Sequence, residues 1–171
     1  MEVTALGTNE KLEQNKHEEP MSLLSRSLLT GFIGGILWGG LAAIAYYFNF
    51  VEVSPKSYVL RSWTQAGWTD TWLGNVIALL FVGVLSILIA LLYYGIFKKI
   101  ESMWMGVFFG IVLWAILLFI LQPIFPNIKP ALELNYETLI TMLCLFVLYG
   151  TFIGYSISYD YHDMLRKKQQ Q

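Results

Sequence analysis

Three residues with metal-binding side chains lie close together near the C-terminus. They are Asp160, His162 and Asp163, and on a helix the two carboxylates would share one face. Zinc needs three or four converging ligands, and the chain's other histidine, His17, is far away in the sequence. Mixed charge at a solvated helix end is the more economical interpretation. We therefore expect no metal site and no cofactor.

Motifs for other kinds of catalysis are missing from the sequence. It contains no His-Glu-x-x-His pair, no paired carboxylates inside an apolar segment, no nucleophile beside a base and no glycine-rich phosphate loop. The single cysteine, Cys144, lies in the middle of an apolar segment, where we expect it to be a core residue. The sequence thus predicts no catalytic residue, and we expect the chain not to be an enzyme.

The elements that would have to position any such residue are four apolar segments without Asp, Glu, Lys or Arg, at residues 27–51, 71–97, 102–128 and 138–159. Each exceeds the roughly 20 residues that a helix needs to cross a bilayer. Only 13% of the residues are charged, against about 25% in soluble domains. The sequence predicts an all-α, polytopic membrane protein with four transmembrane helices. The predicted spans are about 27–49, 71–97, 102–122 and 137–160.

The spans form one predicted domain with two short tails. Residues 1–20 are charged and lack a helical apolar period, so we expect a disordered cytoplasmic tail. Residues 21–165 form the predicted four-helix membrane domain. Residues 166–171 form a predicted basic cytoplasmic tail.

The distribution of basic residues predicts the orientation. Lys and Arg resist translocation, so the side of the membrane with more of them faces the cytoplasm. Eight of the eleven basic residues fall on the side of the two termini. These are Lys11, Lys16, Arg26, Lys98, Lys99, Arg166, Lys167 and Lys168, and those on the other side are Lys56, Arg61 and Lys129. We expect a multi-pass plasma-membrane protein with both termini in the cytoplasm.

Two connections carry structural signals of their own. Ser54 is a good helix N-cap, Pro55 a good first helical residue and Gly67 a good helix end. They predict a short extracytoplasmic amphipathic helix between the first two spans, with an irregular loop as the alternative. The connection at 98–101 is so short that we expect the second and third spans to be antiparallel neighbours.

Small residues recur every four positions in three of the spans. Helices in lipid gain little from hydrophobic burial, so close backbone approach across small residues supplies the packing. The stripe in the first span could dock another subunit or pack within the chain, and we expect the second. The predicted packing residues are Gly31, Gly35, Gly39, Ala43, Gly106, Gly110, Gly150 and Gly154.

Transport coupled to protons or ions is not expected. Such pathways are usually marked by an ionisable group within the membrane, and the four charge-free segments contain no Asp, Glu, Lys, Arg or His. A passive pore would have to be lined by uncharged groups. Gln122, next to Pro123, and the mid-span Trp38 and Trp114 are the candidates for such a lining.

Three segments together resemble a known family. They are Glu19-Pro20-Met21-Ser22, Gly31-Phe-Ile-Gly-Gly35-Ile-Leu-Trp38 and the tyrosine-rich end of the fourth span. With these motifs, its length and its four-span layout, the chain resembles the YqhR-type conserved membrane proteins of Gram-positive, endospore-forming bacteria. The resemblance implies a bacterial plasma-membrane protein, and it transfers no defined activity and no functional residues.

These observations favour a non-catalytic accessory or structural component of the plasma membrane. Its expected partners are the lipid bilayer and either a second copy of the chain or another membrane protein. Nucleic acid is not expected, because the net charge is −1 and no basic run alternates with aromatic residues. The alternatives are a small uncoupled transporter or channel subunit, and a lipid-binding or surface-sensing protein that uses the aromatic outer loop.

Overall fold

The structure, a computed structural model, describes residues 22–61, 64, 67–100, 102–125 and 128–169. Four long helices dominate it, and these residues contain no strand. The helices are α2 (Leu23–Tyr47), α3 (Trp72–Phe97), α4 (Met103–Ala115) and α5 (Tyr136–Gln169). With the turns that continue α4 to Ile124, all four are long and apolar enough to cross a membrane. The predicted all-α fold with four candidate spans is confirmed.

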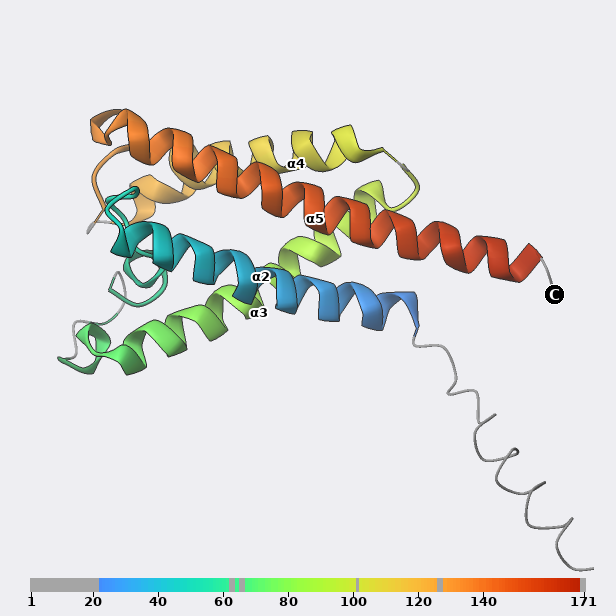
Figure 1. Ribbon diagram of the computed structural model, residues 1–171, viewed down its shortest axis with the longest axis horizontal. Helices are drawn as coiled ribbons and strands as arrows, with labels where there is room; N and C mark the ends of the chain where they lie inside the picture. Colours follow the sequence, from blue (N-terminus) through green and yellow to red (C-terminus); the bar gives the residue numbers. More distant parts are fainter. Residues whose placement is uncertain (1–21, 62–63, 65–66, 101, 126–127, 170–171) are drawn as a thin grey trace, which may run out of the picture.

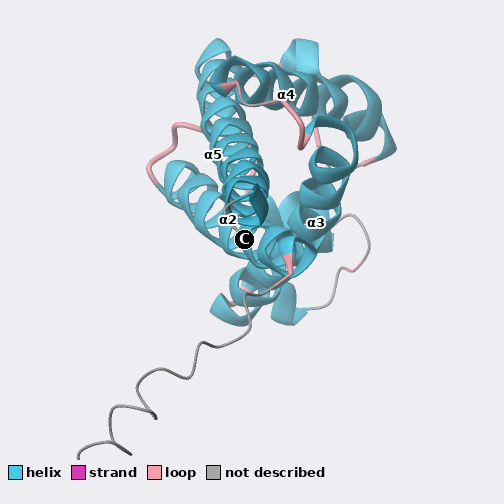
Figure 2. Cartoon of the chain, turned by 90° about the vertical axis from the view of Figure 1, so that its right-hand side faces the viewer, coloured by secondary structure: helices cyan, strands magenta, loops and turns pink. Residues whose placement is uncertain are grey.

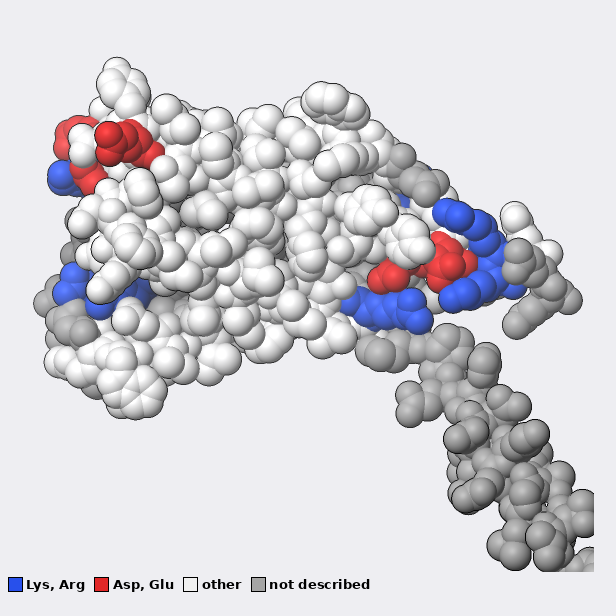
Figure 3. Space-filling model, in the orientation of Figure 1, with Lys and Arg blue, Asp and Glu red and all other residues white. Residues whose placement is uncertain are grey.

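The chain runs back and forth between the two ends of an elongated bundle (Figure 1). One end, which we call the loop end, holds the connections at residues 48–71 and 125–135. The other, the terminal end, holds the start of α2, the α3–α4 turn and the C-terminal part of α5. On the face drawn in Figure 3, charged side chains gather at both ends and leave a charge-free band between them. Such a band suits a lipid environment.

Local sequence sets the limits of α2. Ser22 is the N-cap, and its side chain accepts a hydrogen bond from the Ser25 backbone N–H at 3.2 Å. The helix therefore begins before residue 27, where the first span was predicted to start. It ends at Tyr47, and Asn49 then adopts a positive φ of 61°, which asparagine tolerates better than most residues.

Pro123 changes the geometry of the third span. α4 is α-helical only to Ala115, the next segment, η3 (Ile116–Leu121), is π-helical, and η4 (Gln122–Ile124) is a 3-10 turn. The Gln122 N–H bonds the carbonyl five residues earlier. Proline lacks an N–H and its ring crowds the carbonyl four residues before it, so the helix widens ahead of it. The span predicted at 102–122 thus changes helix type part-way along.

α5 is longer than the span predicted at 137–160. It runs from Tyr136 to Gln169, and its 34 residues give a length of about 51 Å. A bilayer core is about 30 Å thick, so the C-terminal turns project beyond it. Residues 166–169, predicted to be part of a separate tail, continue this helix because no Pro or Gly interrupts them. Residues 170–171 and the tail predicted at 1–20 lie outside the described residues.

Within the helix predicted at 54–67, the described residues are helical at 55–61 and not at residue 64. A π-helical segment, η1, covers Ser57–Arg61, and a separate 3-10 turn, η2, covers Gly67–Asp70. Tyr58 of η1 packs into the core of the loop end, edge-on to Phe125 with ring centroids 5.7 Å apart. This ring of the loop segment therefore faces the protein, where its apolar body is buried.

Two helix pairs build the bundle. α2 packs most extensively on α3 and α4 on α5, and α2 and α5 then join the pairs. The view along the bundle in Figure 2 shows α3 and α4 spread apart. The predicted packing of α3 on α4 is therefore wrong for most of their length. They meet near their connecting turn, where the rings of Tyr93 and Phe97 lie 5.0 and 6.0 Å from that of Phe109.

Candidate functional site

The glycine stripe of α2 faces α3. Gly31 and Gly35 are buried, and a Cβ added to Gly31 would lie 3.0 Å from the carbonyl oxygen of Ser86. Gly39 is also buried in this seam, whereas Ala43 is half-buried and lines a cleft at the loop end. Three of the four stripe residues are thus used inside the chain and are not available to another subunit.

The glycines of α4 and α5 bring two backbones into direct contact. Gly106 and Gly110 face Gly150 and Gly154, and all four are buried. A Cβ added to Gly150 would lie 2.5 Å from the Gly110 nitrogen and 2.6 Å from the Gly106 carbonyl oxygen. Nothing larger than glycine fits this seam without moving a helix.

A buried pair of hydroxyl groups connects three helices. Ser86 of α3 donates to the Gly31 carbonyl of α2 at 2.5 Å, and its Oγ lies 2.5 Å from the Tyr149 hydroxyl of α5. Because a hydroxyl has one proton, Tyr149 must donate to Ser86 in this arrangement. The pair belongs to the packing of the core and leaves neither oxygen free to act on a substrate.

The three residues predicted to line a pore lie in packed surroundings. Trp38 packs against the core cluster around Tyr93, and Trp114 packs against a second cluster around Leu118. Gln122 is 1% exposed, and its side-chain amide donates to the carbonyl of Lys129. Gln122 therefore ties η4 to the chain that follows it. None of the three predicted pore residues lines the cleft at the loop end.

Glu52 joins the two connections of the loop end. Its carboxylate accepts a hydrogen bond from the Asn135 side chain and lies 3.4 Å from the Lys129 ammonium group. Its backbone N–H donates to the Thr138 hydroxyl at 3.1 Å. Glu52 belongs to the α2–α3 connection, and its partners lie just before and within α5. We call Glu52, Lys129, Asn135 and Thr138 the Glu52 cluster.

A cleft of about 940 Å³ opens beside this cluster. Its lining combines polar residues, which we call the polar rim, with small and aliphatic side chains from α2 and α3, which we call the apolar wall. The polar rim includes Asn49, Glu52, Lys56, Asn75, Lys129 and Asn135. The apolar wall includes Gly39, Ala43, Val76, Ala78 and Leu79. A cleft lined by both polar and apolar groups is suited to an amphipathic ligand.

Neither Glu52 nor Asn75 was singled out from the sequence. Asn75 is exposed in the first turn of α3, between apolar neighbours such as Val76. A polar side chain at such a position was the available signal. Glu52 gave no comparable signal, because its partner Lys129 is 77 positions away in the chain.

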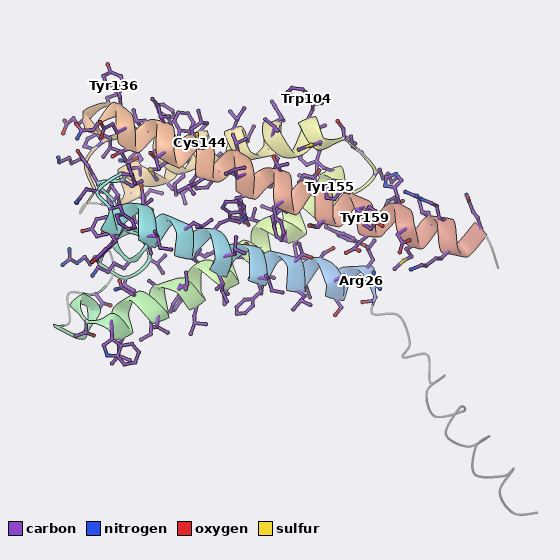
Figure 4. All side chains as sticks on the ribbon, viewed as in Figure 1. Arg26, Trp104, Tyr136, Cys144, Tyr155 and Tyr159 are labelled. Carbon is purple, nitrogen blue, oxygen red and sulfur yellow. The ribbon has the colours of Figure 1, made fainter. Side chains whose placement is uncertain are left out.

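At the terminal end the candidate metal ligands are engaged with protein groups. Asp160 of α5 forms an ion pair with Arg26 at 3.4 Å. Arg26, labelled in Figure 4, lies in the first turn of α2, so the ion pair connects the start of α2 to α5. Asp163 pairs with Lys167 at 2.8 Å, and the His162 Nδ1 lies 2.9 Å from a backbone carbonyl oxygen. Within the described part of the chain, no three His, Cys, Asp or Glu residues come together as a metal site.

Cys144 does not occupy the core position expected for it. Its side chain is exposed on α5, with Tyr136 toward the loop end of the same helix (Figure 4). The faces of α5 that pack against other helices carry Tyr149, Ile153 and Ile157, and these residues are buried. An apolar sequence around a cysteine cannot distinguish these faces from one that contacts lipid.

Comparison with known proteins decides the family. The family model for the conserved membrane protein YqhR matches residues 7–171. The chain belongs to this family. A relative in Bacillus subtilis (strain 168), named "Uncharacterized protein YqhR", is 41% identical over 160 residues, which cover 94% of this chain and 89% of the relative. No solved structure matches the chain. The predicted family is confirmed, and the four apolar helices fit an integral, multi-pass membrane protein.

Proposed function

We propose that this YqhR-family protein is a non-catalytic accessory component of the bacterial plasma membrane that acts through its loop end. The observation that carries the proposal is the Glu52 cluster. Its hydrogen bonds and ion pair join the α2–α3 connection to the α4–α5 connection and to the first turn of α5. Two separate loops thereby become one ordered surface, which is a property expected of a binding face rather than of a simple link.

The use of the buried polar groups supports a non-catalytic role. Ser86 and Tyr149 bond to each other, and Ser86 also bonds to the backbone of α2. Gln122 bonds to the backbone of the loop end. The small residues of α2 pack against α3, so we assign contact with a second copy or another membrane protein to the loop end. The proposed partner therefore meets a surface outside the helix seams.

The proposed orientation places both termini in the cytoplasm and the loop end outside. Its support is the excess of basic residues on the terminal side. The test uses single cysteines at Leu132, which is 91% exposed, and at Lys99, in a Cys144→Ser background. We expect a membrane-impermeant maleimide to label intact cells at position 132 and not at 99. Labelling at 99 alone would reverse the orientation.

The accessory role is tested by photo-crosslinking in cells. A photoreactive residue at Leu132 reports on the loop end, and one at Leu88, which is 56% exposed along α3, reports on the lipid-facing surface. We expect a protein adduct at 132, either with a second copy or with another protein, and none at 88. Glu52→Ala should weaken the adduct, whereas Glu133→Ala, a charge change at an exposed site nearby, should not.

Two results would contradict this proposal. The first is the absence of a protein adduct at position 132 when the chain is present in the membrane at its normal level. The second is an adduct of equal yield at position 88, because this would mean that the helices, and not the loop end, meet the partner.

A further inference from the structure

The charges around the loop-end cleft do not balance. Glu52 is an acidic residue of the lining, and its carboxylate is already bound by Lys129 and Asn135. Lys56 also lines the cleft, and the ion pairs of the described residues leave it without a carboxylate partner. One positive charge therefore remains at the rim, and a ligand with a negative group would neutralise it.

The apolar wall of the cleft differs chemically from the polar rim. Gly39 and Ala43 come from α2, and Val76, Ala78 and Leu79 come from α3. Both helices are long and apolar enough to cross a membrane. A hydrocarbon chain placed here would contact small and aliphatic side chains instead of water.

The rim also offers uncharged groups. Asn49 and Asn75 are exposed and line the same cleft, one after the end of α2 and one in the first turn of α3. Each asparagine amide carries two N–H donors, and phosphate oxygens are strong acceptors. A cleft whose lining includes a lysine and two amides therefore offers suitable groups for binding a phosphate.

We propose that this cleft binds an anionic phospholipid. Its phosphate lies beside Lys56 and the asparagine amides, and the first part of an acyl chain lies along the wall between α2 and α3. The volume of about 940 Å³ is within the range of small-molecule sites, about 300–1,000 Å³, so the rest of the lipid remains in the bilayer. The site is independent of whether the Glu52 cluster also meets a protein partner.

The test measures binding of two lipids to the delipidated, full-length protein in mild detergent by native mass spectrometry. The probes are phosphatidylglycerol, which is anionic, and phosphatidylcholine, which has no net charge. We expect phosphatidylglycerol to bind more tightly than phosphatidylcholine. Lys56→Gln should lower the affinity for phosphatidylglycerol about tenfold, or about 1.4 kcal/mol, and should have little effect on the affinity for phosphatidylcholine. Lys99→Gln makes the same charge change at the terminal end and should leave both affinities unchanged.

A second pair of variants tests the acyl position. Ala43 lines the wall, and its neighbour Ala42 is also half-buried but does not line the cleft. Ala43→Phe should lower the affinity for both lipids several-fold, and Ala42→Phe should leave both affinities unchanged. If Ala43→Phe does not fold, the comparison of Lys56→Gln with Lys99→Gln decides the question by itself. Lys56 is partly exposed, so its substitution by Gln should leave the fold intact.

Three outcomes would overturn the proposal. Equal affinity for the two lipids would remove the charge recognition. Identical effects of Lys56→Gln and Lys99→Gln would place the lipid elsewhere. Inorganic phosphate that binds as tightly as phosphatidylglycerol, and competes with it, would show that the site takes the ion and not the lipid. None of these results depends on the protein adducts at Leu132, so the two proposals can fail separately.

Discussion

Substitution of Gly150 by alanine should separate α4 from α5. The added Cβ would lie 2.5 Å from the Gly110 nitrogen, 2.6 Å from the Gly110 Cα and 2.6 Å from the Gly106 carbonyl oxygen. All three are backbone atoms of the facing helix, so no side-chain rotation can relieve the overlap. Carbon contacts are optimal at about 3.5–4.0 Å, so the two helices must move apart by about 1 Å.

The expected cost follows from two opposing terms. Overpacking a well-packed core costs about 1–3 kcal/mol, and contact with rigid backbone favours the upper part of that range. Alanine in place of glycine recovers up to about 1 kcal/mol of helix propensity. The net loss should be about 2 kcal/mol. For a chain of this size that corresponds to a fall in melting temperature of about 4–8 °C.

The assay is a melting curve of the purified protein in mild detergent. The quantity measured at each temperature is the fraction of the protein that remains monodisperse after heating. Gly40→Ala is the matched control, because a Cβ at Gly40 would meet no heavy atom within 4 Å. It should leave the melting temperature unchanged or raise it slightly. If Gly150→Ala were as stable as Gly40→Ala, the direct contact between the α4 and α5 backbones would be refuted.

Two further predictions concern the core and the loop end. Ser86→Ala removes the hydrogen bonds to Gly31 and Tyr149 and should lower the free energy of unfolding by about 1 kcal/mol. In a protein that already carries Tyr149→Phe, the same substitution should lower it by less, because one of the two bonds is already missing. Both effects are measured with the melting assay described above. Burial raises the pKa of Tyr58 to about 12 from 10.0, so its contribution to stability is complete below pH 10 and is lost as the pH rises toward 12. Tyr58→Phe should therefore lose less stability than the unmodified protein as the pH rises. The measurement is the melting temperature between pH 9 and pH 12. The same pH profile for both proteins would contradict the burial of this hydroxyl.

Local sequence was sufficient to predict the helices themselves. Lipid offers no partner for a free backbone N–H or C=O, so a long charge-free segment has to become a helix that satisfies its own bonds. The third span was predicted to end at residue 122, just before Pro123, and in the structure Pro123 lies in the 3-10 turn Gln122–Ile124 that ends it. The widening of the helix from Ile116 was not predicted, since a proline does not specify over how many residues the helix adjusts.

The tertiary structure alone decided which surfaces meet. Gly31 and Gly106 begin similar stripes of small residues, yet one stripe packs against α3 and the other against α5. The contact between Glu52 and Lys129 spans 77 positions and follows only from the meeting of the two connections. In lipid every apolar face is equally well solvated, so hydrophobicity identifies the spans but cannot rank their faces. The fit between backbones and small side chains selects the partner, and that fit exists only once the helices are assembled.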